Sequence, residues 1–90
     1  MILIVPVLIR FGRKVRVLVY PGDHLPTHVH VKNTQYEVKV DISGDVAKEM
    51  RPSKKERFKT TPQFTQQALQ LCQDNLNFLK EEVKVYYEAE

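Results

Sequence analysis

Residues 28–42 read His28-Val29-His30-Val31-Lys32-Asn33-Thr34-Gln35-Tyr36-Glu37-Val38-Lys39-Val40-Asp41-Ile42, and they show the clearest structural pattern in the chain. Apolar and polar residues alternate on both sides of Asn33 and Thr34, and a period of two is typical of β-strands. Asparagine and threonine between two such runs favour a tight turn. This stretch therefore predicts a β-hairpin.

The register of this hairpin is restricted by its valines. For the valines of both strands to share one face, directly opposed residues must have numbers with an odd sum. A two-residue turn would place His30 opposite Glu37, and it would place His28 opposite a basic residue, Lys39. A four-residue turn would instead place His28 opposite Asp41. Both registers group histidines with carboxylates.

Two further strands are expected before the hairpin. The first nine residues are an apolar run interrupted by Pro6, which predicts a strand covered on both faces, with the proline at an edge or bulge. Phe11-Gly12-Arg13 is a turn, and the alternation from Val15 to Tyr20 predicts a second strand. Residues 21–27 contain two prolines and a glycine, so we expect an ordered loop there.

A helix is expected after the hairpin. Residues 43–61 form a basic connecting segment, with a short helical turn expected around Val46 to Met50. Thr61 and Pro62 predict a helix start at the end of this segment. Apolar residues then recur at steps of three and four, which predicts an amphipathic helix over 62–88. The main seam consists of Leu69, Cys72, Leu76, Leu79, Val83 and Tyr86. A second apolar stripe consists of Phe64, Leu71, Phe78 and Val85.

Together these elements predict a single domain over residues 1–90 of the α+β class. Residues 1–42 form the β-sheet portion, a small, mostly antiparallel sheet of about four strands, and one long C-terminal helix packs on a face of it. The apolar arc of this helix is wider than one small sheet covers. The remaining apolar surface of the helix is buried in one of two ways. The chain forms a homo-oligomer or docks on a second protein, or the segment 43–61 of the same chain covers that surface.

Composition restricts the class of protein. The apolar share of 42% and the charged share of 28% are ordinary for a globular domain, which argues against a disordered tail, a collagen-like repeat or a membrane bundle. Cys72 is the single cysteine and cannot form an internal disulfide, so we expect a reducing, cytoplasmic location. The apolar start reaches only nine residues before Arg10, which is too short for a membrane span and lacks the features of a targeting segment.

The charges are unevenly distributed around a formal net charge of +3. Two stretches are basic, one with Arg10, Arg13, Lys14 and Arg16, the other with Lys48, Arg51, Lys54, Lys55, Arg57 and Lys59. Cationic side chains release counterions from a nucleic acid, so this distribution predicts a phosphate-rich partner such as RNA. The alternative is an ordinary solvated surface.

All three histidines, His24, His28 and His30, fall within seven residues, next to Asp23. His28 and His30 are two apart on a strand, so both rings leave the same face, and His24 reaches in from the preceding loop. Three uses remain open. The rings could bind a divalent metal such as zinc, or they could perform acid–base catalysis on a phosphodiester without a metal. They could also simply fix the loop to the hairpin. The candidate binding residues around them are Asp23, Arg16, Lys39, Lys54, Lys55 and Arg57.

One part of the chain resembles a known family. Tyr20-Pro21-Gly22-Asp23-His24-Leu25-Pro26-Thr27-His28-Val29-His30-Val31, followed by Tyr36-Glu37-Val38-Lys39-Val40-Asp41, resembles a small bacterial family of unknown function with an Asp-His-x-Pro-Pro-His-x-His-Val signature. The resemblance implies a sheet followed by a helix over the whole chain, and a role beside a cognate small protein in toxin–antitoxin-like modules. The positions that it singles out are Asp23, His24, Pro26, His28 and His30. Two departures are Thr27, where a second proline is usual, and the absence of a tryptophan from the helix.

We therefore begin from three functional hypotheses. The first is a toxin–antitoxin-type component that binds RNA or another phosphate-rich partner, with the histidines as a candidate ribonuclease site. The second is a non-enzymatic protein-interaction module, an antitoxin or adaptor, in which the histidines are structural. The third is a metal-dependent hydrolase. The sequence leaves open whether the chain is an enzyme.

Overall fold

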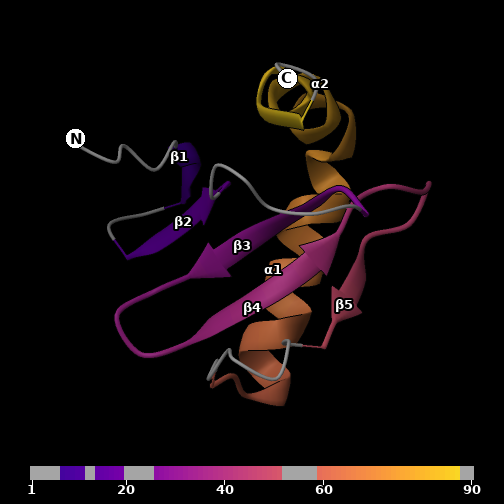
Figure 1. Cartoon of the computed structure of the whole chain (residues 1–90). Helices are drawn as coiled ribbons and strands as arrows, with labels where there is room; N and C mark the ends of the chain where they lie inside the picture. Colours follow the sequence, from indigo (N-terminus) through magenta and orange to yellow (C-terminus); the bar gives the residue numbers. More distant parts are fainter. Residues whose placement is uncertain (1–6, 12–13, 20–25, 52–58, 88–90) are drawn as a thin grey trace.

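The computed structural model describes residues 7–11, 14–19, 26–51 and 59–87. It contains β1 (Val7–Phe11), β2 (Val15–Leu18), β3 (His28–Lys32), β4 (Glu37–Asp41), β5 (Lys48–Met50), α1 (Pro62–Asp74) and α2 (Leu76–Tyr87). The strands form one antiparallel sheet in the order β1-β2-β3-β4-β5 (Figure 1). The expectations for Pro6, for the turn at Gly12 and Arg13, and for residues 20–25 lie outside the described residues.

The β3–β4 hairpin has the register of a four-residue turn, with His28 opposite Asp41 and His30 opposite Lys39. The side chain of Asn33 explains why the turn has four residues and not two. Its Oδ1 accepts hydrogen bonds from the backbone N–H groups of residues 35 and 36, at 2.8 and 2.6 Å. This side chain closes the wider turn locally, and an asparagine is well suited to do so.

The expected α+β class is confirmed. The helices cover one face of the sheet, and α1 runs behind β3 and β4 in Figure 1. Alternate residues of the strands point to these helices and form the core with them. The core consists of Val17, Val19, Val29, Val31, Val38, Val40, Ile42, Ala47, Phe64, Ala68, Cys72, Leu76, Leu79 and Val83.

The helical segment begins as expected but consists of two helices. Thr61 is the N-cap of α1, and its Oγ1 accepts a hydrogen bond from the N–H of Phe64 at 3.1 Å. Asn75 separates α1 from α2, and its side-chain amide donates to the carbonyl of Leu71 at 2.8 Å. This local bond replaces regular helical geometry and lets α2 leave in a new direction, as Figure 1 shows. The seam still stays buried across the break, at Cys72 and Leu79.

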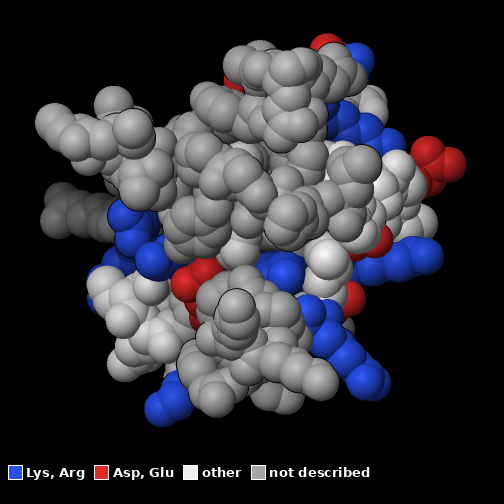
Figure 2. All heavy atoms as spheres, viewed as in Figure 1, with Lys and Arg blue, Asp and Glu red and all other residues white. Residues whose placement is uncertain are grey.

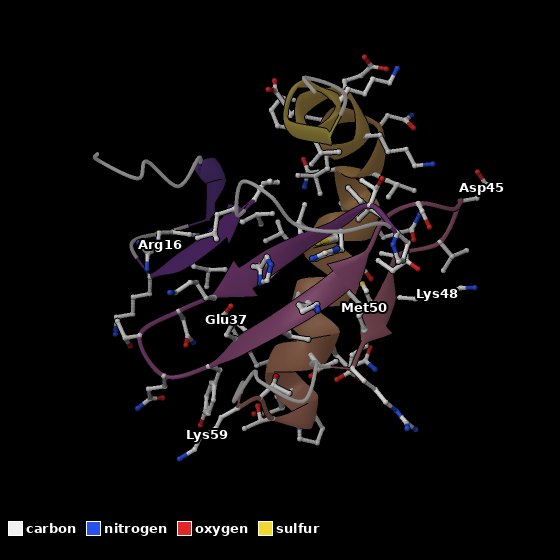
Figure 3. All side chains as sticks on the ribbon, viewed as in Figure 1. Arg16, Glu37, Asp45, Lys48, Met50 and Lys59 are labelled. Carbon is white, nitrogen blue, oxygen red and sulfur yellow. The ribbon has the colours of Figure 1, made fainter. Side chains whose placement is uncertain are left out.

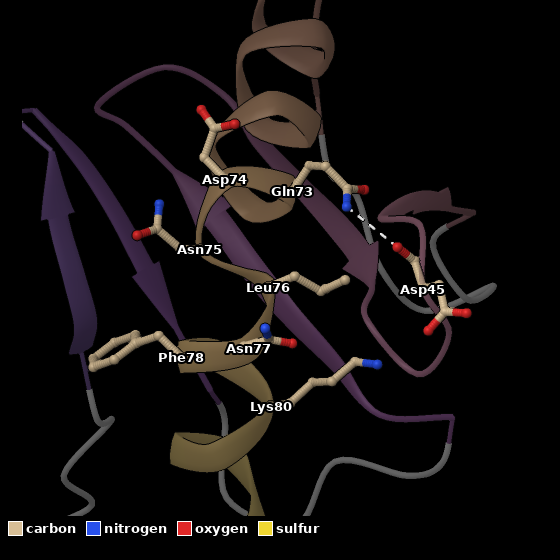
Figure 4. A pocket seen from close by; sticks show the side chains of 8 residues that line it. All are labelled: Asp45, Gln73, Asp74, Asn75, Leu76, Asn77, Phe78 and Lys80. Carbon is tan, nitrogen blue, oxygen red and sulfur yellow. Dashed lines mark hydrogen bonds between the residues drawn. The ribbon is translucent and has the colours of Figure 1, made fainter.

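The helical turn expected around Val46 to Met50 is wrong, because residues 48–50 form β5 on the edge of β4. Gln73 of α1 holds the preceding loop in place. Its Oε1 accepts from the N–H of Ala47 at 2.8 Å, and its Nε2 donates to the carbonyl of Asp45 at 3.2 Å (Figure 4). The backbone groups that a helical turn would need are therefore bonded to α1 instead.

The wide apolar arc of the helices is only partly buried. In the second stripe Phe64 is buried, Leu71 is half-buried and Phe78 is 48% exposed. Among the described large apolar side chains, the only other exposed one is Val46, at 58%. Neither of the two described helices has both the length and the apolar character that a membrane span requires.

Candidate functional site

The face of the sheet turned away from the helices is polar. Strand alternation places the candidate residues Arg16, His28, His30 and Lys39 on it, because their neighbours in sequence belong to the core. Opposed residues form three cross-strand rows: Arg10, Arg16, Lys32 and Glu37; Leu18, His30, Lys39 and Met50; and His28, Asp41 and Lys48. Figure 2 views the molecule from this side and shows Lys and Arg side chains interspersed with Asp and Glu side chains among the described residues.

His28 and His30 lie side by side at the centre of this face. Their ring centroids are 5.3 Å apart, with the planes inclined by 60°. Both residues are buried, at 4% and 1% exposure. His30 Nδ1 donates to Glu37 Oε2 at 3.1 Å, and His28 Nδ1 donates to the carbonyl of Pro26 at 2.9 Å. Carboxylate and carbonyl oxygens only accept, so each ring carries a proton on Nδ1.

These two hydrogen bonds limit the chemistry of the rings. With Nδ1 committed as a donor, proton transfer or metal binding has to use Nε2. The Pro26 bond fixes the end of the loop that precedes β3, and the Glu37 bond ties β3 to β4. The arrangement therefore supports the structural use of the histidines, and it also orients the rings.

Asp41 and Lys39 complete the surroundings of the rings. Lys39 is 9% exposed and lies opposite His30. Ser43 donates to Asp41 Oδ1 from its hydroxyl at 2.6 Å and from its backbone N–H at 2.8 Å. These bonds hold the pKa of Asp41 below its ordinary value of 3.8 against partial desolvation, and the charges of Lys48 and His28 lower the pKa further.

A second feature of this face is its basic row, which we define as Arg16 and Lys32. These two residues oppose one another across β2 and β3. Arg16 and Lys32 are half-buried, and Lys32 Nζ lies 3.9 Å from Glu37 Oε1 at the end of the row. Figure 3 shows Arg16, Glu37 and Lys59 toward the β3–β4 turn, whereas Lys48 lies toward the other end of the sheet.

The basic row ends at a shallow depression of about 280 Å³, which we call the hairpin hollow. It is lined by Lys32, Asn33, Thr34, Gln35, Tyr36, Glu37 and Lys59. The backbone N–H of Glu37 donates to the carbonyl of Lys59 at 2.8 Å, which fixes the segment before α1 beside β4.

A family model described as "Domain of unknown function (DUF4160)" matches residues 14–82. The chain belongs to the DUF4160 family. The match runs from just before β2 into α2, so it includes the two histidines and most of the polar face. Comparisons with curated proteins and with solved structures found no match.

Several predicted site residues of this DUF4160 chain lie outside the described residues. They are Asp23, His24, Lys54, Lys55 and Arg57. Whether they join His28 and His30 therefore stays a prediction. Within the described ranges, no group of three or more His, Cys, Asp or Glu residues is arranged to hold a metal ion.

Sequence reasoning missed Lys32 of the DUF4160 polar face, which the four-residue register places opposite Glu37. It also missed Tyr36, which packs against the core on the helix side of the sheet. Cys72 behaves as expected for a core residue, since burial raises the pKa of its thiol to about 12. It is therefore a poor nucleophile.

A second depression of the DUF4160 domain, of about 390 Å³, lies where α1 meets α2 (Figure 4). Its lining includes Asp45, Asp74 and Lys80, and its Gln73 is engaged with the loop before β5. These side chains combine both signs of charge, and no described group among them is arranged to hold a metal ion. We therefore assign the candidate site to the polar face of the sheet.

Proposed function

We propose that this DUF4160 chain is an RNA-binding component of a toxin–antitoxin-type module and that it contacts RNA phosphates through its basic row. The observation that carries the proposal is the direct opposition of Arg16 and Lys32 on neighbouring strands. Like charges that face each other in a sheet are destabilising.

An anion over the row would offset this repulsion. Neighbouring strands lie about 4.8 Å apart, so Arg16 and Lys32 place two cationic side chains next to each other. A phosphate backbone supplies negative charges along a line, and it releases counterions when lysine and arginine bind it. A single small anion would neutralise only part of the row.

The burial of the histidines supports binding rather than cleavage. A general acid or base must come within hydrogen-bond reach of the reacting phosphate. His28 and His30 are at most 4% exposed, and both use Nδ1 to bond the protein itself. In this proposal they position the hairpin that presents Lys32.

Fluorescence anisotropy with a labelled RNA oligonucleotide tests the proposal. We expect Arg16→Ala and Lys32→Ala each to weaken binding about threefold to tenfold, because each removes one phosphate contact. Lys84→Ala is the matched control, since Lys84 is an exposed lysine on α2 that pairs only with Glu81 in the described contacts. Equal losses in all three variants, or no binding by the parent chain, would contradict the proposal.

The toxin–antitoxin role has a separate test. Induced expression of the parent chain should slow the growth of the cells. If this inhibition acts through RNA binding, cells that express the Arg16→Ala/Lys32→Ala double variant should grow normally. Normal growth on induction of the parent chain would remove the toxin role. Cleavage of the RNA by purified protein, lost in His28→Ala, would favour the ribonuclease hypothesis instead.

A metal-dependent hydrolase remains the second candidate, and one observation favours it. Histidines that bind metals usually donate their other ring N–H to a carboxylate or a backbone carbonyl. His30 and His28 make these two kinds of bond. Elemental analysis of protein purified without an affinity tag distinguishes the candidates, because tight zinc binding requires stoichiometric metal that His30→Ala loses.

A further inference from the structure

We infer that the hairpin hollow accepts one base of a single-stranded RNA whose phosphates follow the basic row, an inference that rests on the proposed function. Lys32 belongs to both features, since it ends the row and lines the hollow. A strand bound along the row is therefore led into the hollow. The volume of about 280 Å³ lies just below the roughly 300–1,000 Å³ that is typical of small-molecule pockets, so the hollow suits a group no larger than a single base.

The charge of the hollow suits a nucleotide. Lys32 and Lys59 line it, and Glu37 is the one carboxylate among the lining residues that the structure describes. Glu37 accepts from His30 and lies 3.9 Å from Lys32, so its charge is partly compensated by neighbours. The side chain of Lys59 is exposed and enters from the segment that precedes α1, opposite the hairpin turn.

Tyr36 lines the hollow from the side of the sheet that packs on the helices. Its ring lies 5.7 Å from the ring of Phe64, which is buried in the core. The half-buried tyrosine is thus held in place before a ligand arrives. A ring that is already ordered loses little entropy when a base stacks on it, and such stacking accepts any base.

The turn supplies polar groups for the edge of the base. Asn33 Oδ1 is occupied by two backbone N–H groups, which leaves its amide nitrogen as a donor. Thr34 and Gln35 are exposed beside it. A base inside a duplex is stacked between its neighbours and cannot enter a hollow of this kind. The arrangement therefore selects single-stranded over double-stranded RNA.

Anisotropy measurements on three probes test the inference: a labelled uridine octamer, a double-stranded RNA of the same length, and an abasic oligonucleotide with the same number of phosphates. We expect the octamer to bind about tenfold tighter than the other two. Tyr36→Leu should abolish most of this preference, whereas Tyr36→Phe should retain it. Lys59→Ala should weaken octamer binding about threefold and Lys84→Ala should leave it unchanged.

Photo-crosslinking with a 4-thiouridine octamer gives a readout that does not depend on the stability of a variant. Mass spectrometry should locate the crosslink on the peptide that contains Tyr36. Equal binding of the octamer and the abasic probe, with both weakened by Arg16→Ala, would overturn the inference and leave the proposed function standing. Crosslinks found only elsewhere would also overturn it. Failure of all three probes to bind would overturn both.

Discussion

His30 is the most buried polar side chain that the structure describes, at 1% exposure, and its Nδ1 hydrogen bond joins β3 to β4. His30→Ala would open a cavity and remove the donor to Glu37, so we expect it to lower the free energy of unfolding by about 2–4 kcal/mol. Urea unfolding measures this change. Under native conditions the folded variant should still bind RNA, with an affinity lowered by less than in Lys32→Ala, because His30 positions the hairpin and does not itself contact the RNA. A stable variant that lost RNA binding would point to a direct role for the ring.

Asp41 is a residue whose contribution to stability should depend on pH. Ser43 stabilises the ionised carboxylate and lowers its pKa, so the group stabilises the fold above its ordinary pKa and loses this effect as the pH falls through the lower, folded pKa. Asp41→Asn should therefore cost about 1 kcal/mol at neutral pH and less at an acid pH at which the carboxyl is protonated in the folded protein as well. Urea unfolding at both pH values measures the difference, with the exposed Asp45→Asn as control. An equal loss in the free energy of unfolding at both pH values would show that Ser43 does not stabilise the negative charge of Asp41.

At the scale of the elements, α1 depends on its N-cap. Thr61→Ala removes the acceptor for the N–H of Phe64, and we expect a loss of about 1 kcal/mol in the free energy of unfolding. Thermal or urea unfolding measures it. Thr34→Ala is the matched control, because Thr34 is an exposed threonine in the hairpin turn. If both variants lose the same stability, the cap contributes nothing particular to α1.

The elements that could be predicted were those with a local signal. The alternation of residues 28–42 identified the hairpin, and Thr61-Pro62 identified the start of α1. β5 has no such signal, since Lys48-Glu49-Met50 does not alternate and pairs only because β4 offers an edge and Gln73 holds the loop. The break at Asn75 was hidden because the apolar period of the helices continues across it.

The candidate site was predictable only in part for a similar reason. Parity within the hairpin is a local property, so the sequence alone groups the histidines with carboxylates, as the pairing of His28 with Asp41 confirms. The opposition of Arg16 and Lys32 depends instead on how β2 pairs with β3, two strands joined by residues 19–27. No local pattern fixes a register across a connection of that length.

For the whole molecule, self-association is still a prediction, and Phe78 offers a test of it. Phe78 and Val46 are the exposed large apolar side chains of the described surface, and Phe78 lies on the helices, where the wide apolar arc was expected to need a partner. If that arc forms a dimer, light scattering across a concentration series should show a mass increase that Phe78→Ser abolishes and Val46→Ser retains. Neither substitution should change the free energy of unfolding of the monomer by more than about 0.5 kcal/mol. A monomer at all concentrations would contradict the expectation and with it the interaction-module hypothesis in its homo-oligomeric form.

The salt dependence of RNA binding distinguishes a built site from the general attraction of a chain with a net charge of +3. Each phosphate contact on a single strand contributes about −0.7 to the slope of log K against log salt, so contacts from Arg16, Lys32 and Lys59 predict a total of roughly −2. Arg16→Ala and Lys84→Ala both lower the net charge by one. A diffuse attraction would respond equally to the two substitutions, whereas the basic row predicts that only Arg16→Ala reduces the slope, by about 0.7. Anisotropy titrations at four or five salt concentrations measure both slopes. Equal slopes for the two variants would show that the RNA is attracted by the net charge of the protein and not by the cross-strand alignment of Arg16 with Lys32.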